Sequence, residues 1–375
     1  MFYNDSPAPS AVPTHSALLP TIEEFPFPSV ARKLSWNAAR GTGAARPSLI
    51  PFFGAGASAA SSPKPAGDQG AIARGFPKGR DLALDLAEQA NGVARNFPDA
   101  MDLGKSARYY EIIVGRNELR EELHGRFHRD AKDMDATIQD AITSAGANMF
   151  FTTNYDALIE HSLSRRGAKF VVAVEVIDPI ELRVVMGGQA RIERVTHTKL
   201  LLFDYRGGAK LGELKAIQRE QFDPHEYLSE DCSIVYKMHG SVCPQPPHSQ
   251  FLISDKDYVN FMLNRSGTML PAKVAAYVQT RNFLFLGYSL RDWNFRLLFA
   301  KLSDSQNANG RRNAARSKET DVRPNDAGSF AVMLHSSRMD QEIWQASSVR
   351  IFSGELSDFA VKMVKAVQNL KQNNL

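Results

Sequence analysis

The chain has 375 residues, of which 43% are hydrophobic and 23% charged, and its formal net charge is +4. This composition is typical of a soluble globular protein with one large domain, or with one large domain and a smaller one. The small net charge gives no reason to expect binding to nucleic acid or to a membrane surface. No run of about 18 apolar residues occurs, which excludes a membrane-spanning helix.

The sequence contains only two cysteines, Cys232 and Cys243. Two thiols cannot build a disulfide scaffold or the four-thiolate zinc site that paired CxxC motifs indicate. We therefore expect a protein of a reducing compartment, the cytoplasm.

Residues 1–45 are rich in Pro, Ala and Ser and contain three acidic residues but no apolar core segment. This pattern favours a partly ordered arm over a signal peptide or a transit sequence. We expect the arm to offer a surface for assembly contacts and residues 46–375 to form the main domain.

The first predicted strand, 48–53, is a short apolar run that ends at Gly54, and helix-favouring sequence resumes at 80–87. Residues 54–59, GAGASA, fit the spacing G-x-G-x-x-G/A of a strand-to-helix turn whose backbone N–H groups can approach a pyrophosphate. The motif alone also fits a structural turn, because the acidic residue that a dehydrogenase places about 20 positions later has no convincing counterpart.

A second apolar strand, 148–152, ends on Thr153, Asn154 and Asp156. A carboxamide and a carboxylate at a strand end can belong to a ligand site, or they can cap the next helix. Helical spacing of apolar residues predicts one or two helices over 107–127 and further helices over 136–145 and 157–164.

A strand is predicted over 170–176, and residues 180–230 are mixed, consistent with an inserted subdomain or with β-hairpins. The strand 232–237 leads to His239 in the stretch KMHG. A lone histidine is usually structural, but one at the ligand edge of a sheet can serve as a general base.

The last third of the chain begins with an apolar strand, 282–286, that ends at Gly287. Residues 303–326 are polar and rich in Gly and Asn, which predicts a long exposed loop. The remaining predicted elements are a helix at 293–302, strands at 329–334 and 349–352, and a final helix at 356–371.

Strands that alternate with helices in this way predict an α/β fold, a Rossmann-like and mostly parallel sheet with helices on both faces. Insertions near 80–145 and 180–230 add a smaller helical or mixed part. Ligands of such sheets bind beyond the carboxyl ends of the strands. Four strand ends carry residues that suit a nucleotide site: Gly54, Asn154, His239 and Gly287.

The order of the motifs GAGAS, TTNYD, KMHG and LFLGYSLRDWN resembles the bacterial sirtuin-like family, named after silent information regulator proteins, and most of all its branch of antiviral defence proteins that degrade NAD. The resemblance covers about 48–300 and, weakly, the final strands. It implies that Asn154, Asp156 and His239 are catalytic. It also implies a nucleotide-binding set consisting of Gly54, Ala55, Gly56, Ser58, Pro77, Thr153, Gly287, Ser289 and Asp292.

Two departures from the family pattern bear on the reaction. The segment 61–74 between the glycine loop and Gly75-Phe76-Pro77 is long and rich in Pro and Ala. The four-cysteine zinc module that follows the histidine in protein-deacylating sirtuins has no counterpart, because Cys243 is followed by Pro-Gln-Pro-Pro. The resemblance therefore implies NAD as a substrate, no zinc, and no platform for an acyl-lysine peptide.

The resemblance, together with these departures, implies an NAD+ hydrolase that releases nicotinamide and ADP-ribose as an effector of anti-phage defence. The resemblance implies a homo-oligomer and a separately encoded activator, such as a HerA-like ATPase or a short Argonaute protein, with no membrane and no direct nucleic-acid contact. The alternatives are a non-catalytic sensor or scaffold that binds NAD or ADP-ribose, an NAD-dependent protein deacylase and, least of all, a dehydrogenase.

Overall fold

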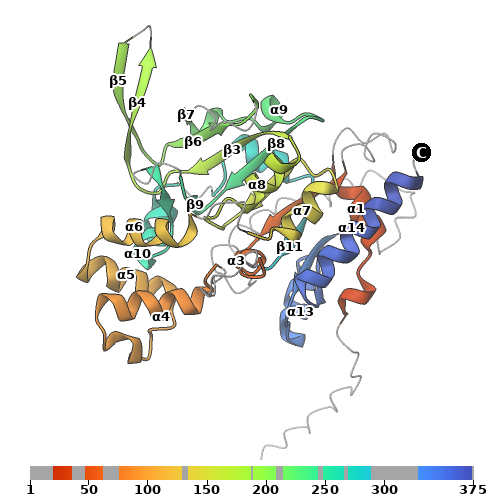
Figure 1. The fold of residues 1–375 in the computed structure, drawn as a ribbon, viewed down its shortest axis with the longest axis horizontal. Coiled ribbons are helices and arrows are strands. Elements are labelled where there is room, and N and C mark those ends of the chain that lie inside the picture. Colours follow the sequence, from red (N-terminus) through yellow and green to blue (C-terminus); the bar gives the residue numbers. More distant parts are fainter. Residues whose placement is uncertain are drawn as a thin grey trace, which may run out of the picture.

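A nine-stranded sheet forms the centre of the computed structural model (Figure 1), which describes residues 20–35, 47–61, 76–128, 134–186, 189–207, 214–243, 248–265, 269–288 and 328–373. The strand order is β13-β12-β11-β1-β2-β8-β3-β6-β7. The strands from β13 to β3 run parallel, and β6 is antiparallel to both its neighbours. In chain order the strands are β1 Leu49–Phe53, β2 Met149–Thr152, β3 Lys169–Glu175, β6 Lys199–Asp204, β7 Leu214–Gln218, β8 Cys232–Lys237, β11 Asn282–Leu286, β12 Ser329–Met333 and β13 Val349–Ser353.

The sequence of β1 explains why this strand lies at the centre of the sheet. All five of its residues are buried. Leu49 and Phe53 pack into the apolar cluster on one face, whereas Ile50 and Phe52 pack into the cluster on the other. Alternation with a period of two between two buried faces is the pattern of a strand in a parallel sheet that helices cover on both sides.

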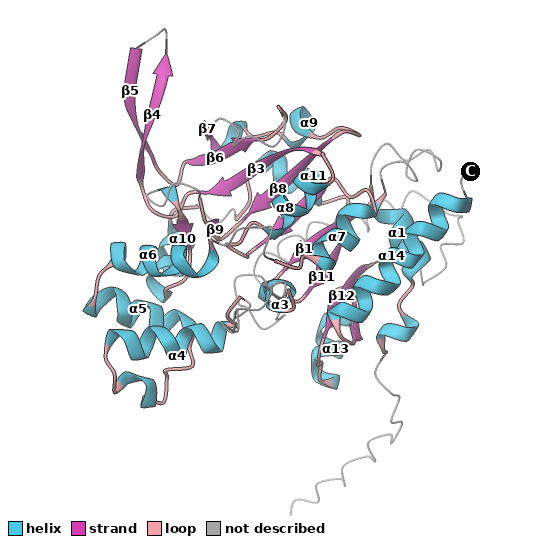
Figure 2. Cartoon of the chain, in the orientation of Figure 1, coloured by secondary structure: helices cyan, strands magenta, loops and turns pink. Residues whose placement is uncertain are grey.

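Helices lie on both faces of the sheet (Figure 2), which confirms the predicted fold class. The first face carries α1 Phe27–Leu34, α7 Thr137–Ser144, α8 Leu158–Arg165 and α14 Leu356–Asn373. The second carries α9 Pro224–Tyr227, α11 Ala272–Val278 and α13 Arg338–Ala346. In the described part of the predicted arm, Val30, Ala31 and Leu34 of α1 are fully buried against the first face, so this helix belongs to the core.

A smaller helical unit with its own apolar cluster stands beside the sheet (Figure 1). It consists of α4 Gly79–Ala90, α5 Leu103–Ile113 and α6 Arg116–Phe127, with α10 Asp255–Leu263 packed on α5. Residues 107–127 form parts of two helices because Gly115, with φ of +137°, separates them. The side chains of Asp102 and Ser254 accept hydrogen bonds from the first turns of α5 and α10 and so fix where these helices begin.

The segment 180–230 contains a hairpin as well as two strands that extend the main sheet. The hairpin strands β4 Ile180–Met186 and β5 Gln189–Val195 project from the body of the protein (Figure 1), and β6 and β7 follow at the sheet edge. Short strands β9 Gly240–Ser241 and β10 Gln250–Phe251 pair with each other. The helix predicted at 293–302 and the loop predicted at 303–326 lie outside the described residues. Among the helices that are described, none has the length and apolar character to cross a membrane.

Candidate functional site

Four neighbouring strands, β11, β1, β2 and β8, bring the predicted site segments to one edge of the sheet. These strands are consecutive in the sheet and parallel. Their carboxyl ends therefore point the same way, and Gly287, Gly54, Thr153 and Met238 follow them directly. From β1 the chain continues to β2, which lies on one side of β1, whereas β11, later in the sequence, lies on the other side. The strand order therefore reverses between β1 and β11. Ligands of open α/β sheets bind at such a point.

The glycine loop after β1 packs against the turn after β11. It leads into the short helix α3 Ala55–Ala59. The backbone N–H of Gly56 donates to the carbonyl oxygen of Gly287 at 2.7 Å, and that of Gly54 donates to Leu286 at 3.0 Å. A Cβ on Gly56 would lie 2.7 Å from the Gly287 oxygen, and one on Gly287, whose φ is +64°, would lie 2.1 Å from the Ala57 nitrogen. The glycines are thus required by the approach of these two backbones to each other.

A cleft of about 540 Å³ borders this pair of glycine turns. Its volume is within the range of small-molecule sites. Three of the predicted nucleotide-binding residues line it, and the predicted Pro77 directly precedes the lining residue Lys78. The lining consists of Ala55, Gly56, Ala59, Ala60, Lys78, Gly79, Gly287, Tyr288, Met333, Leu334, His335, Asp340, Gly354, Glu355 and Leu356.

A second hollow, of about 710 Å³, lies at the opposite end of the sheet, where β3 and β8 begin. It is lined by none of the predicted site residues. Two of its charged residues, Asp204 and Arg206, already form an ion pair with each other. We therefore place the nucleotide-binding part of the candidate site at the smaller cleft, beside the glycine loop. Asn154, Asp156 and His239 are not among the lining residues of this cleft.

Asn154 is held on the glycine loop by its side chain. Its Nδ2 donates to the carbonyl oxygen of Gly54 at 2.9 Å and to Oγ of Ser58 at 2.7 Å. A carbonyl oxygen only accepts hydrogen bonds, so the NH₂ group must face Gly54 and the amide oxygen must point elsewhere. The backbone N–H of Asn154 donates to Thr152 Oγ1, which itself donates to the carbonyl of Phe53. The glycine loop thus holds the carboxamide, and Thr152 of β2 holds the backbone that carries it.

Asp156 joins the same loop to the start of α8. Its Oδ2 accepts a hydrogen bond of 2.6 Å from Ser58 Oγ, and its Oδ1 accepts one of 3.0 Å from the backbone N–H of Leu158. Ser58 and Asp156 are buried. Asp156 thus lies one residue before the N-cap Ala157, accepts a hydrogen bond from the N–H of the first residue of α8, and links this segment to the glycine loop. Thr153, also predicted, donates its backbone N–H to Phe53.

His239 follows β8 and is 5% exposed. Its ring packs edge to face on Tyr258 and Phe261 of α10, with ring centroids 5.7 and 6.4 Å away. The histidine segment lies next to the asparagine segment, because the Met238 N–H donates to the carbonyl of Thr152 at 3.0 Å. The structure therefore places His239 one strand away from Asn154, with α10 as its cover.

Sequence reasoning assigned no role to Lys237, which is fully buried. Its ammonium group lies 2.8 Å from Oε1 of Glu160 and donates to the carbonyl oxygens of Tyr155 and Asp156. Lysine is almost never fully buried unless it is paired. The available signal was a lysine at the end of CSIVYK, a strand whose other residues are apolar or small.

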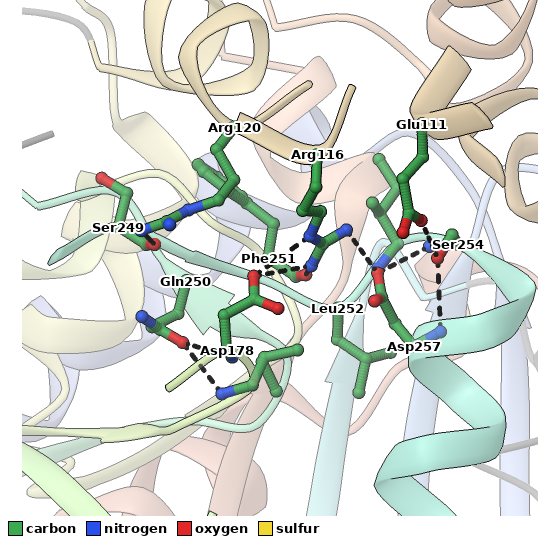
Figure 3. A network of polar contacts seen from close by, with 12 residues as sticks. Glu111, Arg116, Arg120, Asp178, Ser249, Gln250, Phe251, Leu252, Ser254 and Asp257 are labelled. Carbon is green, nitrogen blue, oxygen red and sulfur yellow. Dashed lines mark hydrogen bonds and ion pairs between the residues drawn. The ribbon is translucent and has the colours of Figure 1, made fainter. Parts of the chain in front are cut away.

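A second network, centred on Arg116 of α6, reaches the histidine segment from outside (Figure 3). The Arg116 guanidinium donates to Asp178 at 2.8 Å, to Asp257 at 3.0 Å and to the carbonyl of Phe251 at 3.0 Å. Burial lowers the pKa of Arg116, but Asp178 and Asp257 raise it more, so its charge is secure. Because β10 pairs with β9 directly after His239, Arg116 ties the helical unit to this segment.

The two cysteines do not fit a zinc site. Cys232 opens β8 and Cys243 follows β9, so they lie at opposite ends of the strand that leads to His239. Both are buried. In the described ranges no group of three or more His, Cys, Asp or Glu side chains is placed to hold a metal ion. The predicted residues Ser289 and Asp292 lie outside these ranges.

A SIR2-like domain matches residues 148–352, which is more than half of the chain. The chain belongs to the SIR2-like domain family. The match includes the three segments with Asn154, His239 and Gly287 and begins after the glycine loop. Membership of this family agrees with the resemblance seen in the sequence motifs.

Solved structures of Sir2 enzymes align with this SIR2-like chain over most of its length. A structure on the mechanism and regulation of Sir2 enzymes and one of a Sir2 homologue with NAD each cover 86% of this chain, at 11% identity and a TM-score of 0.33, and 93% and 90% of their own lengths. A Sir2 protein bound to a myristoylated histone peptide covers 87% of this chain and 92% of its own, at 13% identity and a TM-score of 0.29. No curated protein sequence matches. The family assignment rests on the domain match.

Proposed function

We propose that this protein hydrolyses NAD+ to nicotinamide and ADP-ribose. The observation that carries the proposal is the fixed carboxamide of Asn154, anchored on the Gly54 carbonyl and Ser58 at the sheet edge, one strand away from the buried His239. A protein that binds a nucleotide without hydrolysing it needs neither a positioned water nor a general base. The glycine loop and the adjoining cleft supply room for the rest of the dinucleotide.

The reaction breaks the bond between the anomeric carbon of the ribose and the nitrogen of the nicotinamide ring. The bonding electrons pass to the ring nitrogen, so the pyridinium departs as neutral nicotinamide and needs no acid. Positive charge develops on the ribose in an oxocarbenium-like transition state, as in glycoside hydrolysis. Water then adds to the anomeric carbon and loses a proton.

Each residue at the sheet edge has a role in this proposal. The amide oxygen of Asn154 accepts a hydrogen bond from the attacking water or a ribose hydroxyl, because its NH₂ group is engaged by the loop. His239 accepts the proton from water or from a ribose hydroxyl. Asp156, whose two oxygens are bound by Ser58 and Leu158, orients Asn154 through Ser58. Ser289 and Asp292 are proposed to contact the nucleotide by family resemblance alone.

Protein deacylation is less well supported, because it uses a platform that a zinc module builds and the two cysteines lie at opposite ends of β8. A sensor or scaffold that binds NAD or ADP-ribose remains the second candidate, since the glycine loop and cleft alone would suffice for it. The two functions differ in one respect: only the hydrolase would turn NAD+ over, and this turnover would depend on Asn154 and His239.

We further propose that the hydrolase acts in the cytoplasm as an effector of anti-phage defence, by NAD+ depletion under the control of a partner or of assembly. An unregulated NAD+ hydrolase would harm its own cell. The burial of His239, which packs against Tyr258 and Phe261, supports such control, because a general base needs access to its substrate.

The test is nicotinamide release from NAD+ by the purified protein, alone and with the product of a neighbouring gene. Asn154→Ala and His239→Ala should each lower the rate by about 100-fold or more, which is typical for loss of a proton-transfer or positioning group. Asn264→Ala, on the exposed end of α10, and His197→Ala, in the turn after β5, are matched controls expected to keep the rate. Bound NAD without turnover under any condition would favour the sensor.

A further inference from the structure

The β4–β5 hairpin has a rigid root. Ile180 and Leu182 of β4 and Val195 of β5 are buried in the main core. Just before β4, the Asp178 side chain is bound by Arg116, and the backbone N–H groups of Ile177 and Asp178 both donate to Gln250 Oε1 at 2.9 Å (Figure 3). The direction in which the hairpin leaves the body is therefore fixed by contacts at its root.

Beyond the root, the hairpin stands apart from the rest of the structure (Figure 1). It is a sheet of two strands, to which no third strand is added in the described part of the chain. An isolated two-stranded ribbon is only marginally stable in water, and an unpaired strand edge readily pairs with another strand. Ile192 of β5 is 72% exposed, an unusual state for a large β-branched side chain on a strand.

The sequence of β5 is complementary to itself around Ile192. An antiparallel pair of β5 strands centred on this residue would set Ile192 opposite its own copy. It would also set Arg191 of each chain opposite Glu193 of the other, which gives two opposite-charge pairs on the second face. Directly opposed residues of antiparallel strands interact in this way.

Within one chain these charges have no cross-strand counterparts. Arg191 lies opposite Val184, and Glu193 lies opposite Leu182. Arg191 is exposed, whereas Glu193 forms an ion pair with Lys199 at the root. A second chain would therefore provide Arg191 with the opposite charge that its own hairpin strand does not.

We propose that β5 is the dimerisation edge of this protein, and that two copies join their hairpins by antiparallel β5–β5 pairing centred on Ile192. The interface is isologous, as expected for a two-fold dimer. The pairing would turn two ribbons of two strands into one sheet of four. Self-complementarity selects a second copy of this chain over an unrelated partner.

A charge-exchange experiment tests the proposal by sedimentation or light scattering of the full chain. Arg191→Glu alone and Glu193→Arg alone each replace two attractive contacts by two repulsive ones. Each should lower the association constant by about tenfold or more relative to wild type. An equimolar mixture of the two variants should reassociate, because one chain is then acidic at both positions and the other is basic at both.

Lys199→Met is the matched control, because it removes the ion pair of Glu193 at the root without altering the paired edge; it should leave the association constant unchanged. Circular dichroism of each variant checks that the chain is folded. The proposal is overturned if the wild type is monomeric at about 50 µM, if both single variants associate as the wild type does, or if their mixture stays dissociated.

Discussion

Two neighbouring residues of β8, Tyr236 and Lys237, reach into buried ionic clusters on opposite faces of the sheet. Lys237 pairs with Glu160 at 2.8 Å and donates to two carbonyl oxygens of the asparagine segment. The Tyr236 hydroxyl donates to Oε1 of Glu175 at 2.6 Å. Both clusters are buried. Lys237 also contacts backbone carbonyl oxygens, whereas Glu175 also contacts arginine side chains.

The Glu175 carboxylate is enclosed by buried side chains. Arg265 lies 2.5 Å and Arg219 lies 3.3 Å from the Glu175 carboxylate, and all three side chains are no more than 6% exposed. Burial, followed by the charge of Glu175, raises the pKa of Tyr236 well above its ordinary value, so the hydroxyl remains a donor. Its contacts stabilise the fold, whereas those of Lys237 shape the backbone that carries Asn154 and Asp156. The comparison separates a cluster that serves stability from one that serves the site.

The largest effect on stability is expected for Glu175→Gln. The change removes the buried carboxylate that Arg265 and Arg219 both contact, while Arg219 keeps its ion pair with Glu220. Removing one partner of a buried ion pair costs about 3–5 kcal/mol. Chemical denaturation should show this loss, whereas the rate of nicotinamide release per folded molecule should stay near wild type. A large loss of rate in the folded fraction would contradict the assignment of this cluster to stability.

Lys237→Met should reduce stability less than Glu175→Gln does, but it should reduce the rate of nicotinamide release more. The loss of stability should be about 3 kcal/mol, at the lower end of the same range, because one buried ion pair is broken instead of two. The rate of nicotinamide release should fall by about tenfold or more, because the carbonyls of Tyr155 and Asp156 lose their donor and a small displacement of catalytic groups is costly. Glu160→Gln, which leaves the lysine in place, should retain more activity; equal activity in both variants would argue against this role of Lys237.

Ser58→Ala tests the same distinction between stability and activity by removing a single hydroxyl group. The change removes a hydrogen bond to Asp156 and leaves Asn154 with one fewer acceptor, at a cost of about 1–2 kcal/mol in unfolding free energy. Ser61→Ala is the control, because Ser61 Oγ is equally buried and donates to the Ala57 carbonyl of its own helical turn. Only the Ser58 variant should also lose activity; thermal unfolding and initial rates measure the two effects.

The smallest effect concerns Glu111, an ionic group outside both clusters. Burial raises its pKa, but the hydrogen bond from Lys256 and the charge of Arg116 lower it more, so the net shift is downward from 4.5. A carboxylate with a lowered folded pKa stabilises the protein above its ordinary pKa, and that contribution is lost as the pH falls through the folded value. The stability advantage of wild type over Glu111→Gln should therefore persist at neutral pH and shrink below about pH 4.5.

The matched control for this pH dependence is Glu342→Gln, which disrupts an exposed pair with Arg338. Exposed pairs contribute at most about 1 kcal/mol. Its difference from wild type should be small throughout the pH titration, as followed by thermal unfolding. A pH dependence as large as that of Glu111→Gln would mean that the Glu111 effect is not specific to its buried carboxylate.

The sheet and its ligand edge could be predicted because each central strand is an apolar run that stops at a polar residue or a glycine. Contacts between segments that are far apart in the sequence could not be predicted. The only sign in the sequence of the contact between the Gly54 loop and Gly287 is a run of small residues. Phosphate-binding loops and ordinary turns share that pattern. Lys237 was missed because charge normally indicates exposure. The hairpin was ambiguous because charged and apolar residues alternate along it without a clear inner face.

The packing of the Gly54 loop against Gly287 has a consequence for the biosynthesis of the protein. The chain emerges from the ribosome with β1 first, but the strand and turn that shape the glycine loop follow only after β11 has been made. Contacts between such distant segments form late and slowly. A nascent chain that ends before β11 should therefore lack the proposed NAD+ hydrolase activity until its synthesis is well advanced.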